Sequence, residues 1–223
     1  MVLSRIEFPI FTGIKCNMMP FIQGDSSSLP EKYKTYSDIV DANYLEKGKI
    51  GLLTIDEAFV DSGKSQRGYN SMGINRNVHI EVGHVANVTA WGGSGSGWGS
   101  STPTPTVGWG SGSGWGGRAR VLLAKETQVL VANSIDNTCM LWDTMDTRFT
   151  NDGDLSAYID DYPENTGIMM KAGDLAKISI FTPHECITQQ KPGNRQFIRI
   201  VGDGVTGRED YFTINPLLVG HLN

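Results

Sequence analysis

The sequence predicts a mainly β protein, built as a double-sheet jelly roll (double-stranded β-helix) with one or two flanking helices. From about residue 50 onward, seven or eight short apolar segments follow one another with almost no helical periodicity between them. That pattern is typical of a sandwich or barrel rather than of βαβ units. A chain of 223 residues with 39% hydrophobic residues can form one sizeable core. We therefore expect a single domain, 1–223.

The first fifth of the chain predicts one short strand and one helix. Residues 6–11 are expected to form the strand, and an irregular stretch with Pro20 follows it. Pro30 with Glu31 behind it is a common helix start. The helix should bury Ile39, Val40 and Leu45, and Gly48 should end it.

The remaining strands are predicted from runs of apolar residues, many of them alternating with polar ones. They cover 49–59, 78–82, 118–124, 127–133, 138–144, 167–172, 175–181 and 196–201. Residues 61–77 are predicted to be a loop, and 149–164 a loop with one helical turn. The closing strands, 175–181 and 196–201, are predicted to be joined as a hairpin through a turn at 189–194, where Pro192 and Gly193 supply the turn chemistry.

A low-complexity insert, WGGSGSGWGSSTPTPTVGWGSGSGWGG, occupies 91–117. Its Gly and Ser residues make a chain flexible, and its Thr-Pro repeats stiffen the middle. Three interpretations stay open: a disordered surface loop, a lid, or a surface for a partner or self-association. In the lid interpretation, four tryptophans would close over a bound molecule: Trp91, Trp98, Trp109 and Trp115.

Charge and cysteine content exclude several classes of protein. The net charge is −5 and no basic run exists, so nothing indicates nucleic-acid binding. No stretch approaches the roughly 20 apolar residues of a membrane span. The N-terminal residues lack a signal-peptide pattern, and three scattered cysteines form no disulfide framework. We expect a cytoplasmic protein.

Candidate metal ligands come from two distant segments. His79 and Glu81 lie two positions apart on a predicted strand, so their side chains share a face. His184 ends a later strand, and Arg195 begins the next one across the predicted hairpin. Two His and one carboxylate leave open positions on an octahedral metal, which suits Fe(II). A guanidinium at Arg195 could hold a carboxylate bidentately.

These residues resemble the motifs of the Fe(II)- and 2-oxoglutarate-dependent oxygenases, with spacing like that of phytanoyl-CoA hydroxylase and taurine dioxygenase. GDLAKISIFTPHE and GNRQFIRIV are similar to the strands of that family that carry the distal His and the cosubstrate Arg, and DSGKSQRGYNSMGINRNVHIEVG to the approach to its first metal strand. The resemblance covers about residues 60–201. It implies Fe(II) bound by His79, Glu81 and His184, 2-oxoglutarate held by Arg195, and hydroxylation of an unknown small-molecule or side-chain substrate.

The chain departs from the family pattern in three ways. Glu81 stands where most members have Asp, and it must fold back to reach a metal. The 91–117 insert separates the two halves of the metal triad. Arg199 shares the strand face of Arg195, four positions on, and could hold the substrate or the nearer carboxylate of the cosubstrate.

Other interpretations remain for the same residues. His84 could replace His79 or add a ligand, giving a cupin-type metalloenzyme that does not use 2-oxoglutarate. The histidines, Glu81 and Arg195 could instead be satisfied polar groups of a non-catalytic jelly-roll protein that builds a shell or binds a ligand. His221 is expected to be solvated, Trp142 to lie in the core and Asp143 to lie in a turn.

Overall fold

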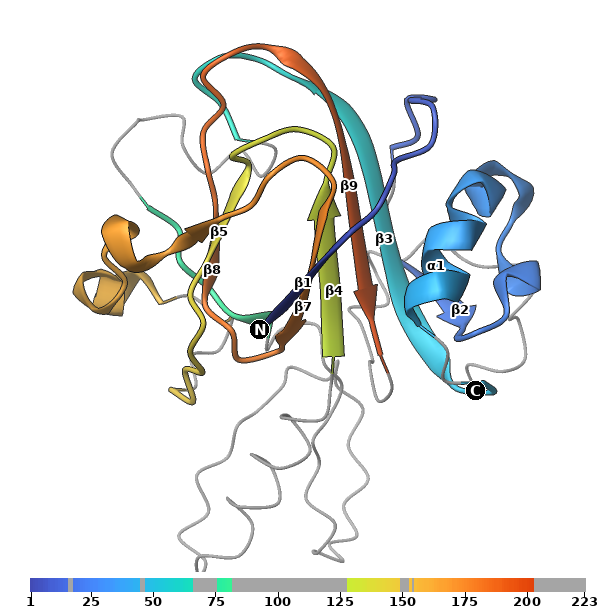
Figure 1. Ribbon diagram of the computed structural model, residues 1–223, viewed down its shortest axis with the longest axis horizontal. Helices are drawn as coiled ribbons and strands as arrows, with labels where there is room; N and C mark the ends of the chain where they lie inside the picture. Colours follow the sequence, from blue (N-terminus) through green and yellow to red (C-terminus); the bar gives the residue numbers. More distant parts are fainter. Residues whose placement is uncertain are drawn as a thin grey trace, which may run out of the picture.

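Two antiparallel sheets make up most of the computed structural model, which describes residues 1–15, 18–44, 47–65, 76–81, 128–148, 153 and 155–202. The large sheet has the order β1-β7-β4-β9-β3-β2, with strands Val2–Arg5, Asp174–Ser179, Gln128–Asn133, Gly193–Val201, Ile50–Val60 and Met18–Ile22. The small sheet has the order β6-β5-β8, with strands Ile168–Met169, Cys139–Leu141 and His184–Cys186. The small sheet lies to one side of the large one and α1 to the other (Figure 1).

Strand β9 separates two cores, because its side chains alternate between the faces of the large sheet. Ile198 and Ile200 belong to the core on the helical side. Val201 belongs to the core that also includes Cys139 and Leu141 of the small sheet. Arg195 and Arg199 have the same parity as Val201, so both arginines point between the two sheets. The prediction that they share a face agrees with this arrangement.

A short helical layer covers the second core. It consists of η1 (Ser26–Ser28), η2 (Glu31–Tyr36) and α1 (Ser37–Asn43). Tyr33, Tyr36 and Val40 are completely buried there against the large sheet, and Ile39 is buried as predicted. The helical stretch begins after Pro30 as predicted. It ends before Gly48, because Tyr44 already has extended backbone angles, φ −137° and ψ 96°. Leu45 is outside the described residues.

The strand predicted at 6–11 is wrong. The first strand is β1, which pairs with β7 from Val2↔Lys177 to Arg5↔Asp174. A buried carboxylate holds the chain that follows: Glu57 accepts hydrogen bonds from the backbone N–H groups of Thr12 at 2.5 Å and Gly13 at 2.6 Å. The chain just after the predicted strand is therefore held by a side chain, because the N–H groups of Thr12 and Gly13 donate to Glu57 and not to a neighbouring strand.

Strand β2 is absent from the prediction because Pro20 lies in its middle. Proline removes a ladder donor and is tolerated mainly in edge strands. Here β2 is the last strand of the large sheet and pairs only with β3, from Met18↔Thr54 to Ile22↔Ile50. The edge position explains how the sequence forms a strand there.

The predicted hairpin between 175–181 and 196–201 is also wrong. Strand β4 lies between β7 and β9, and it pairs with both. The chain turns after β7, where the Thr182 N–H donates to the Ser179 carbonyl at 3.0 Å, and it then enters the small sheet as β8. His184 and the arginines of β9 therefore lie on opposite sheets.

Strands β4, β5 and β6 fall within the predicted segments and are shorter. Strand β3 is shifted by one residue from 49–59, β7 overlaps 175–181, and β9 begins three residues before 196. The η4 helix (Ser156–Asp161) supplies the helical turn expected within 149–164, and η5 (Glu164–Thr166) follows it. Trp142 is 4% exposed, and Asp143 follows it at the surface. The predicted strand 118–124 and the insert 91–117 are outside the described residues. None of the described helices combines the length and apolar character needed to cross a bilayer.

Candidate metal and anion site

Segment 76–81 is held between β8 and the chain near residue 153. The backbones of His79 and His184 exchange two hydrogen bonds of 2.9 Å. On the opposite side, the Ile80 N–H donates to the Gly153 carbonyl, and the Leu155 N–H donates to the Val78 carbonyl, both at 2.9 Å. The segment forms one isolated β-bridge rather than the predicted strand. The side chains of His79 and Glu81 still lie on one side of the segment, and those of Val78 and Ile80 are buried in the core.

The two histidines are in contact and their tautomers are set by the backbone. Their ring centroids are 4.2 Å apart, with 55° between the planes. The Nδ1 atom of His79 lies 2.7 Å from the Asn77 carbonyl oxygen, and that of His184 lies 2.9 Å from the Thr182 carbonyl oxygen. A carbonyl only accepts, so each Nδ1 carries the proton. In the neutral rings Nε2 is then the basic nitrogen, as in metal-binding histidines.

Glu81 joins the histidines to β9. Its Oε1 is 3.4 Å from the His184 Nε2, and its Oε2 is 2.6 Å from the Arg199 Nη1. All three side chains are almost completely buried. The Arg199 Nη2 also donates to the Thr54 hydroxyl at 3.4 Å. The buried carboxylate is thus paired with one guanidinium, and its other oxygen lies beside the His184 ring.

The donor set fits Fe(II) in composition, since two imidazoles and one carboxylate come together on one wall of the sandwich. Within the described ranges, no group of three or more His, Cys, Asp and Glu side chains is arranged so that it could hold a metal ion. Glu81 is directed to Arg199 in this structure. The Glu81 side chain, one methylene longer than that of Asp, reaches Arg199 of β9.

Arg195 lies in the same interior, on the opposite sheet from His184. It is 4% exposed, and its Nη2 donates to the Asn133 Oδ1. Its guanidinium also lies 5.3 Å from the centre of the Phe197 ring. The Arg195 Nε and the Asn133 Nδ2 are buried and have no hydrogen-bond partner in the part of the chain that the structure describes. Burial lowers the pKa of Arg195, although the charge of Asp56 acts in the opposite direction, and no carboxylate of the described residues forms an ion pair with Arg195.

Arg76 and Glu185, which the sequence analysis did not predict as site residues, join segment 76–81 to β8 beside the two histidines. The Arg76 Nε donates to both carboxylate oxygens of Glu185, at 3.1 and 3.2 Å. Glu185 is 2% exposed, and burial raises its pKa, although Arg76 acts in the opposite direction. The sequence offered one signal for this pair, because Glu185 follows His184 and belongs to the quoted PHE motif. Only folding reveals its partner, 109 positions away.

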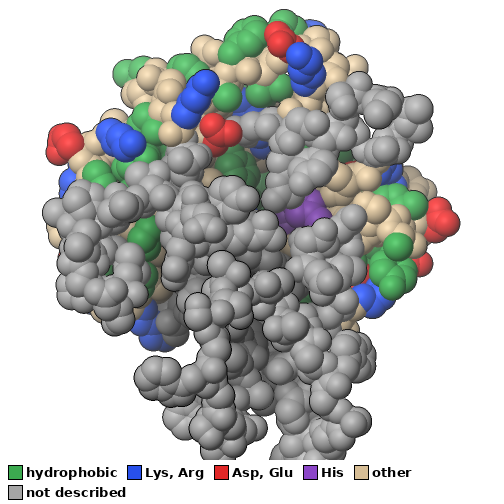
Figure 2. Space-filling model, turned by 180° about the vertical axis from the view of Figure 1, so that it is seen from behind, with side chains coloured by type: hydrophobic (Ala, Val, Ile, Leu, Met, Phe, Trp, Pro, Cys, Tyr) green, Lys and Arg blue, Asp and Glu red, His purple; other side chains and the backbone are tan. Residues whose placement is uncertain are grey.

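A histidine surface is visible between the grey atoms in the space-filling view (Figure 2). His79 is partly exposed and His184 is buried, so the site reaches the surface at its His79 end. His84, His221 and the four tryptophans predicted to form a lid lie outside the described residues: Trp91, Trp98, Trp109 and Trp115.

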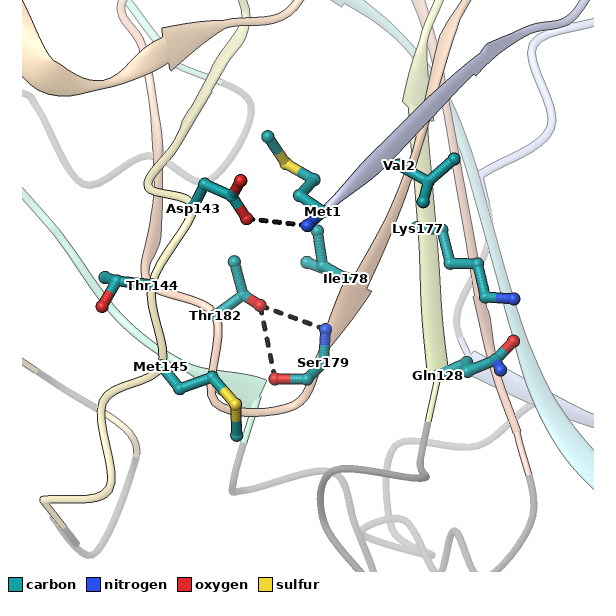
Figure 3. Close-up of a pocket in the computed structure, with 10 residues that line it drawn as sticks. All are labelled: Met1, Val2, Gln128, Asp143, Thr144, Met145, Lys177, Ile178, Ser179 and Thr182. Carbon is teal, nitrogen blue, oxygen red and sulfur yellow. Dashed lines mark hydrogen bonds and ion pairs between the residues drawn. The ribbon is translucent and has the colours of Figure 1, made fainter.

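The two described cavities contain none of the predicted ligands. One, of about 380 Å³, lies between the ends of β1, β4 and β7 and the chain after β5. In it the Met1 amino group forms an ion pair of 2.7 Å with Asp143 (Figure 3). The other, of about 430 Å³, is lined by the turn before β5 and the connection from β8 to β9, ending at Gly193. Gly193, which lines this second cavity, is two residues before Arg195 in β9.

Comparison with known proteins found no family model, no curated protein and no solved structure that matches this chain.

Proposed function

We propose that the protein is an Fe(II)- and 2-oxoglutarate-dependent oxygenase with a jelly-roll fold. The order of the strands supports the fold. We count segment 76–81 with the small sheet, because His79 forms a bridge with His184 of β8. The large sheet then contributes β3, β4, β7 and β9, and the small sheet contributes 76–81, β5, β6 and β8, while β1 and β2 extend the large sheet. Along the chain the segments alternate between the sheets, except that β5 and β6 follow each other in the small one, and this order matches a double-stranded β-helix.

One observation carries the proposed activity. A His–Glu–His cluster with both Nδ1 protons held by backbone carbonyls lies in the same interior as a buried arginine that forms no ion pair with a carboxylate of the described residues, although Asp56 attracts it electrostatically. A buried guanidinium needs a compensating charge. The dicarboxylate 2-oxoglutarate would supply one to Arg195, with Asn133 as a second donor.

The residues of the chain divide the work as follows. His79, Glu81 and His184 would hold the iron, and Arg195 would orient the cosubstrate through its distal carboxylate. Arg199 forms an ion pair with Glu81 inside the sandwich. The two sheets exclude water around these groups, which strengthens each charged contact. When bound, the iron and 2-oxoglutarate would supply oxygen activation coupled to decarboxylation, and the product would be a hydroxylated substrate.

A second candidate follows from the Glu81–Arg199 ion pair itself. A carboxylate already paired with Arg199 and lying beside His184 can belong to the buried polar network of a non-catalytic binding protein. In that case the jelly roll keeps its fold and binds an anionic ligand through Arg195 without a metal. The two candidates differ in whether metal is required for ligand binding.

Anaerobic titration distinguishes the two candidates. Purified protein is mixed with Fe(II), then titrated with 2-oxoglutarate while the metal-to-ligand absorption band is followed. Arg195→Ala should weaken 2-oxoglutarate binding by about 2–5 kcal/mol, because one partner of a desolvated charge pair is lost. Arg5→Ala is the matched control, since Arg5 is a surface arginine with a 69% exposed side chain.

The histidines are tested in the same assay. His184→Ala should abolish the band and iron binding, whereas His221→Ala, at a histidine outside the proposed ligand set, should leave both unchanged. Absence of a band in wild-type protein with iron present would refute the oxygenase proposal. If 2-oxoglutarate then still bound by calorimetry in an Arg195-dependent way, the metal-free binding protein would be the better description.

A further inference from the structure

Two cysteines face each other across the small sheet. Cys139 of β5 is the register partner of Cys186 of β8. The hydrogen bonds on either side, from the Ile187 N–H to the Thr138 carbonyl and from the Trp142 N–H to the Pro183 carbonyl, assign the hydrogen-bonded pairs to 138/187 and 142/183. Pairs alternate along an antiparallel ladder, so 139/186 is a non-hydrogen-bonded pair.

The geometry of such a pair suits a disulfide. The Cα atoms of a non-hydrogen-bonded pair are about 4.5 Å apart, and a disulfide accepts Cα separations of about 4.4–6.8 Å. Cross-strand neighbours also project their side chains to the same face. Both thiols are free in the structure. The backbone can therefore accept the bond without a change of register.

Access to the two sulfur atoms is unequal. Cys139 is 6% exposed and belongs to the core between the sheets, whereas Cys186 is half-buried. A small oxidant would therefore meet Cys186 first. Two positions along the same strands the pair is Leu141↔His184, so the thiols share the face that carries His184.

We propose that Cys139 and Cys186 form a redox modification site that a hydroperoxide converts to a cross-strand disulfide. The Cys186 sulfur attacks one peroxide oxygen; an S–O bond forms, the O–O bond breaks and, with hydrogen peroxide, water leaves. The Cys139 sulfur then attacks the Cys186 sulfur; the S–S bond forms, the S–O bond breaks and a second water leaves. Two thiols are oxidised and one peroxide is reduced, and a thiol reductant reverses the change.

The site does not require the proposed iron chemistry. Its effect is to join β5 and β8 covalently beside His184, and to end oxidation at a reversible product instead of a sulfinic acid. A bond between residues 139 and 186 also restricts the unfolded chain, which stabilises the folded state. The oxidised protein should therefore melt at a higher temperature than the reduced protein.

The test uses Cys16→Ser full-length protein, so that 139 and 186 are the remaining cysteines. One equivalent of hydrogen peroxide should lower the intact mass by two hydrogen atoms, remove both reactive thiols and yield one linked peptide pair. Dithiothreitol should restore the original mass and melting temperature. The same treatment in guanidinium chloride should give much slower linkage, because register no longer holds the thiols together.

Cys186→Ser in the same background is the matched control. It should leave Cys139 largely unmodified, because that thiol is buried, and no change in melting temperature should follow peroxide treatment. Oxygen addition to the Cys16→Ser protein without a linked 139–186 peptide would overturn the proposal, as would linkage found only between two molecules. The decisive measurements use Cys16→Ser alone, so they remain valid if a core cysteine variant fails to fold.

Discussion

Replacing Arg195 by Met and Asn133 by Leu together should make the ligand-free protein more stable than wild type. Arg195 is 4% exposed, and within the described residues its polar contacts amount to one hydrogen bond to a neutral amide. The Arg195 Nε and the Asn133 Nδ2 are buried without partners. A site that keeps a charge and two donors unmatched is destabilised until an anion binds.

The magnitude follows from these contacts. Replacing even well-paired buried charges by apolar residues of similar volume is often neutral or stabilising by about 1–4 kcal/mol, and Arg195 is less well paired than that. Met keeps a sulfur-aromatic contact where the guanidinium now lies over Phe197. At about 2–4 °C per kcal/mol for a chain of this size, the melting temperature should rise by roughly 2–16 °C. Arg195→Met alone should gain less, because it leaves the Asn133 oxygen without its donor.

Thermal and urea denaturation, followed by circular dichroism, measure the effect with and without 2-oxoglutarate. The ligand should stabilise wild type, by about 2.7 kcal/mol at 100 times its dissociation constant, and should leave the double variant unchanged. Arg5→Met serves as the exposed control and should change stability by less than about 0.5 kcal/mol. A double variant that unfolds more easily than wild type without ligand would show that the protein itself already compensates Arg195, and the anion-site argument would fail.

Three further variants test the supports of the site. Glu57→Gln should lower the free energy of unfolding by about 1–3 kcal/mol at pH 7. Burial acts to raise the pKa of Glu57, but the hydrogen bonds to its carboxylate outweigh burial and leave the pKa below its usual value. The extra stability of the wild type should therefore disappear as the pH falls through that lowered pKa. Arg76→Ala should cost about 3–5 kcal/mol in urea unfolding, because Glu185 remains buried without its partner. Gly153→Ala should lower the melting temperature, because φ is +79° and the added Cβ would collide with the Ile80 carbonyl oxygen.

Each of these has an outcome that contradicts it. Equal stability of wild type and Glu57→Gln at pH 7 would show that the hydrogen bonds from Thr12 and Gly13 to Glu57 do not stabilise the fold. An Arg76→Ala protein that unfolds like wild type would mean that Glu185 is solvated or neutral without Arg76. A Gly153→Ala melting curve identical to that of wild type would show that the segment carrying His79 and Glu81 adjusts without strain; Gly63→Ala, also at positive φ but with open space around it, is the matched control.

The amino-acid sequence by itself determined several of the strands, although not β1 or β2, and which polar residues share a face. The apolar alternation in β3, β4 and β9 is local, and the parity of His79 with Glu81 and of Arg195 with Arg199 follows from the two-residue repeat of a strand. The helix start at Pro30 is local in the same way, since it depends on the residues immediately around it. The identities of the candidate site residues needed no tertiary information.

Only the tertiary structure decided which strands are neighbours. The sequence predicted a hairpin of β7 and β9, but β7 pairs with β1 and β4, and β9 pairs with β3 and β4. Arg195 therefore lies on the sheet opposite His184, and Cys139 pairs with Cys186. Pairing is a non-local choice among strands with similar local patterns, and burial of both faces of the large sheet settles it. Partners such as Arg76 and Glu185, distant in sequence, come together as a result of that choice.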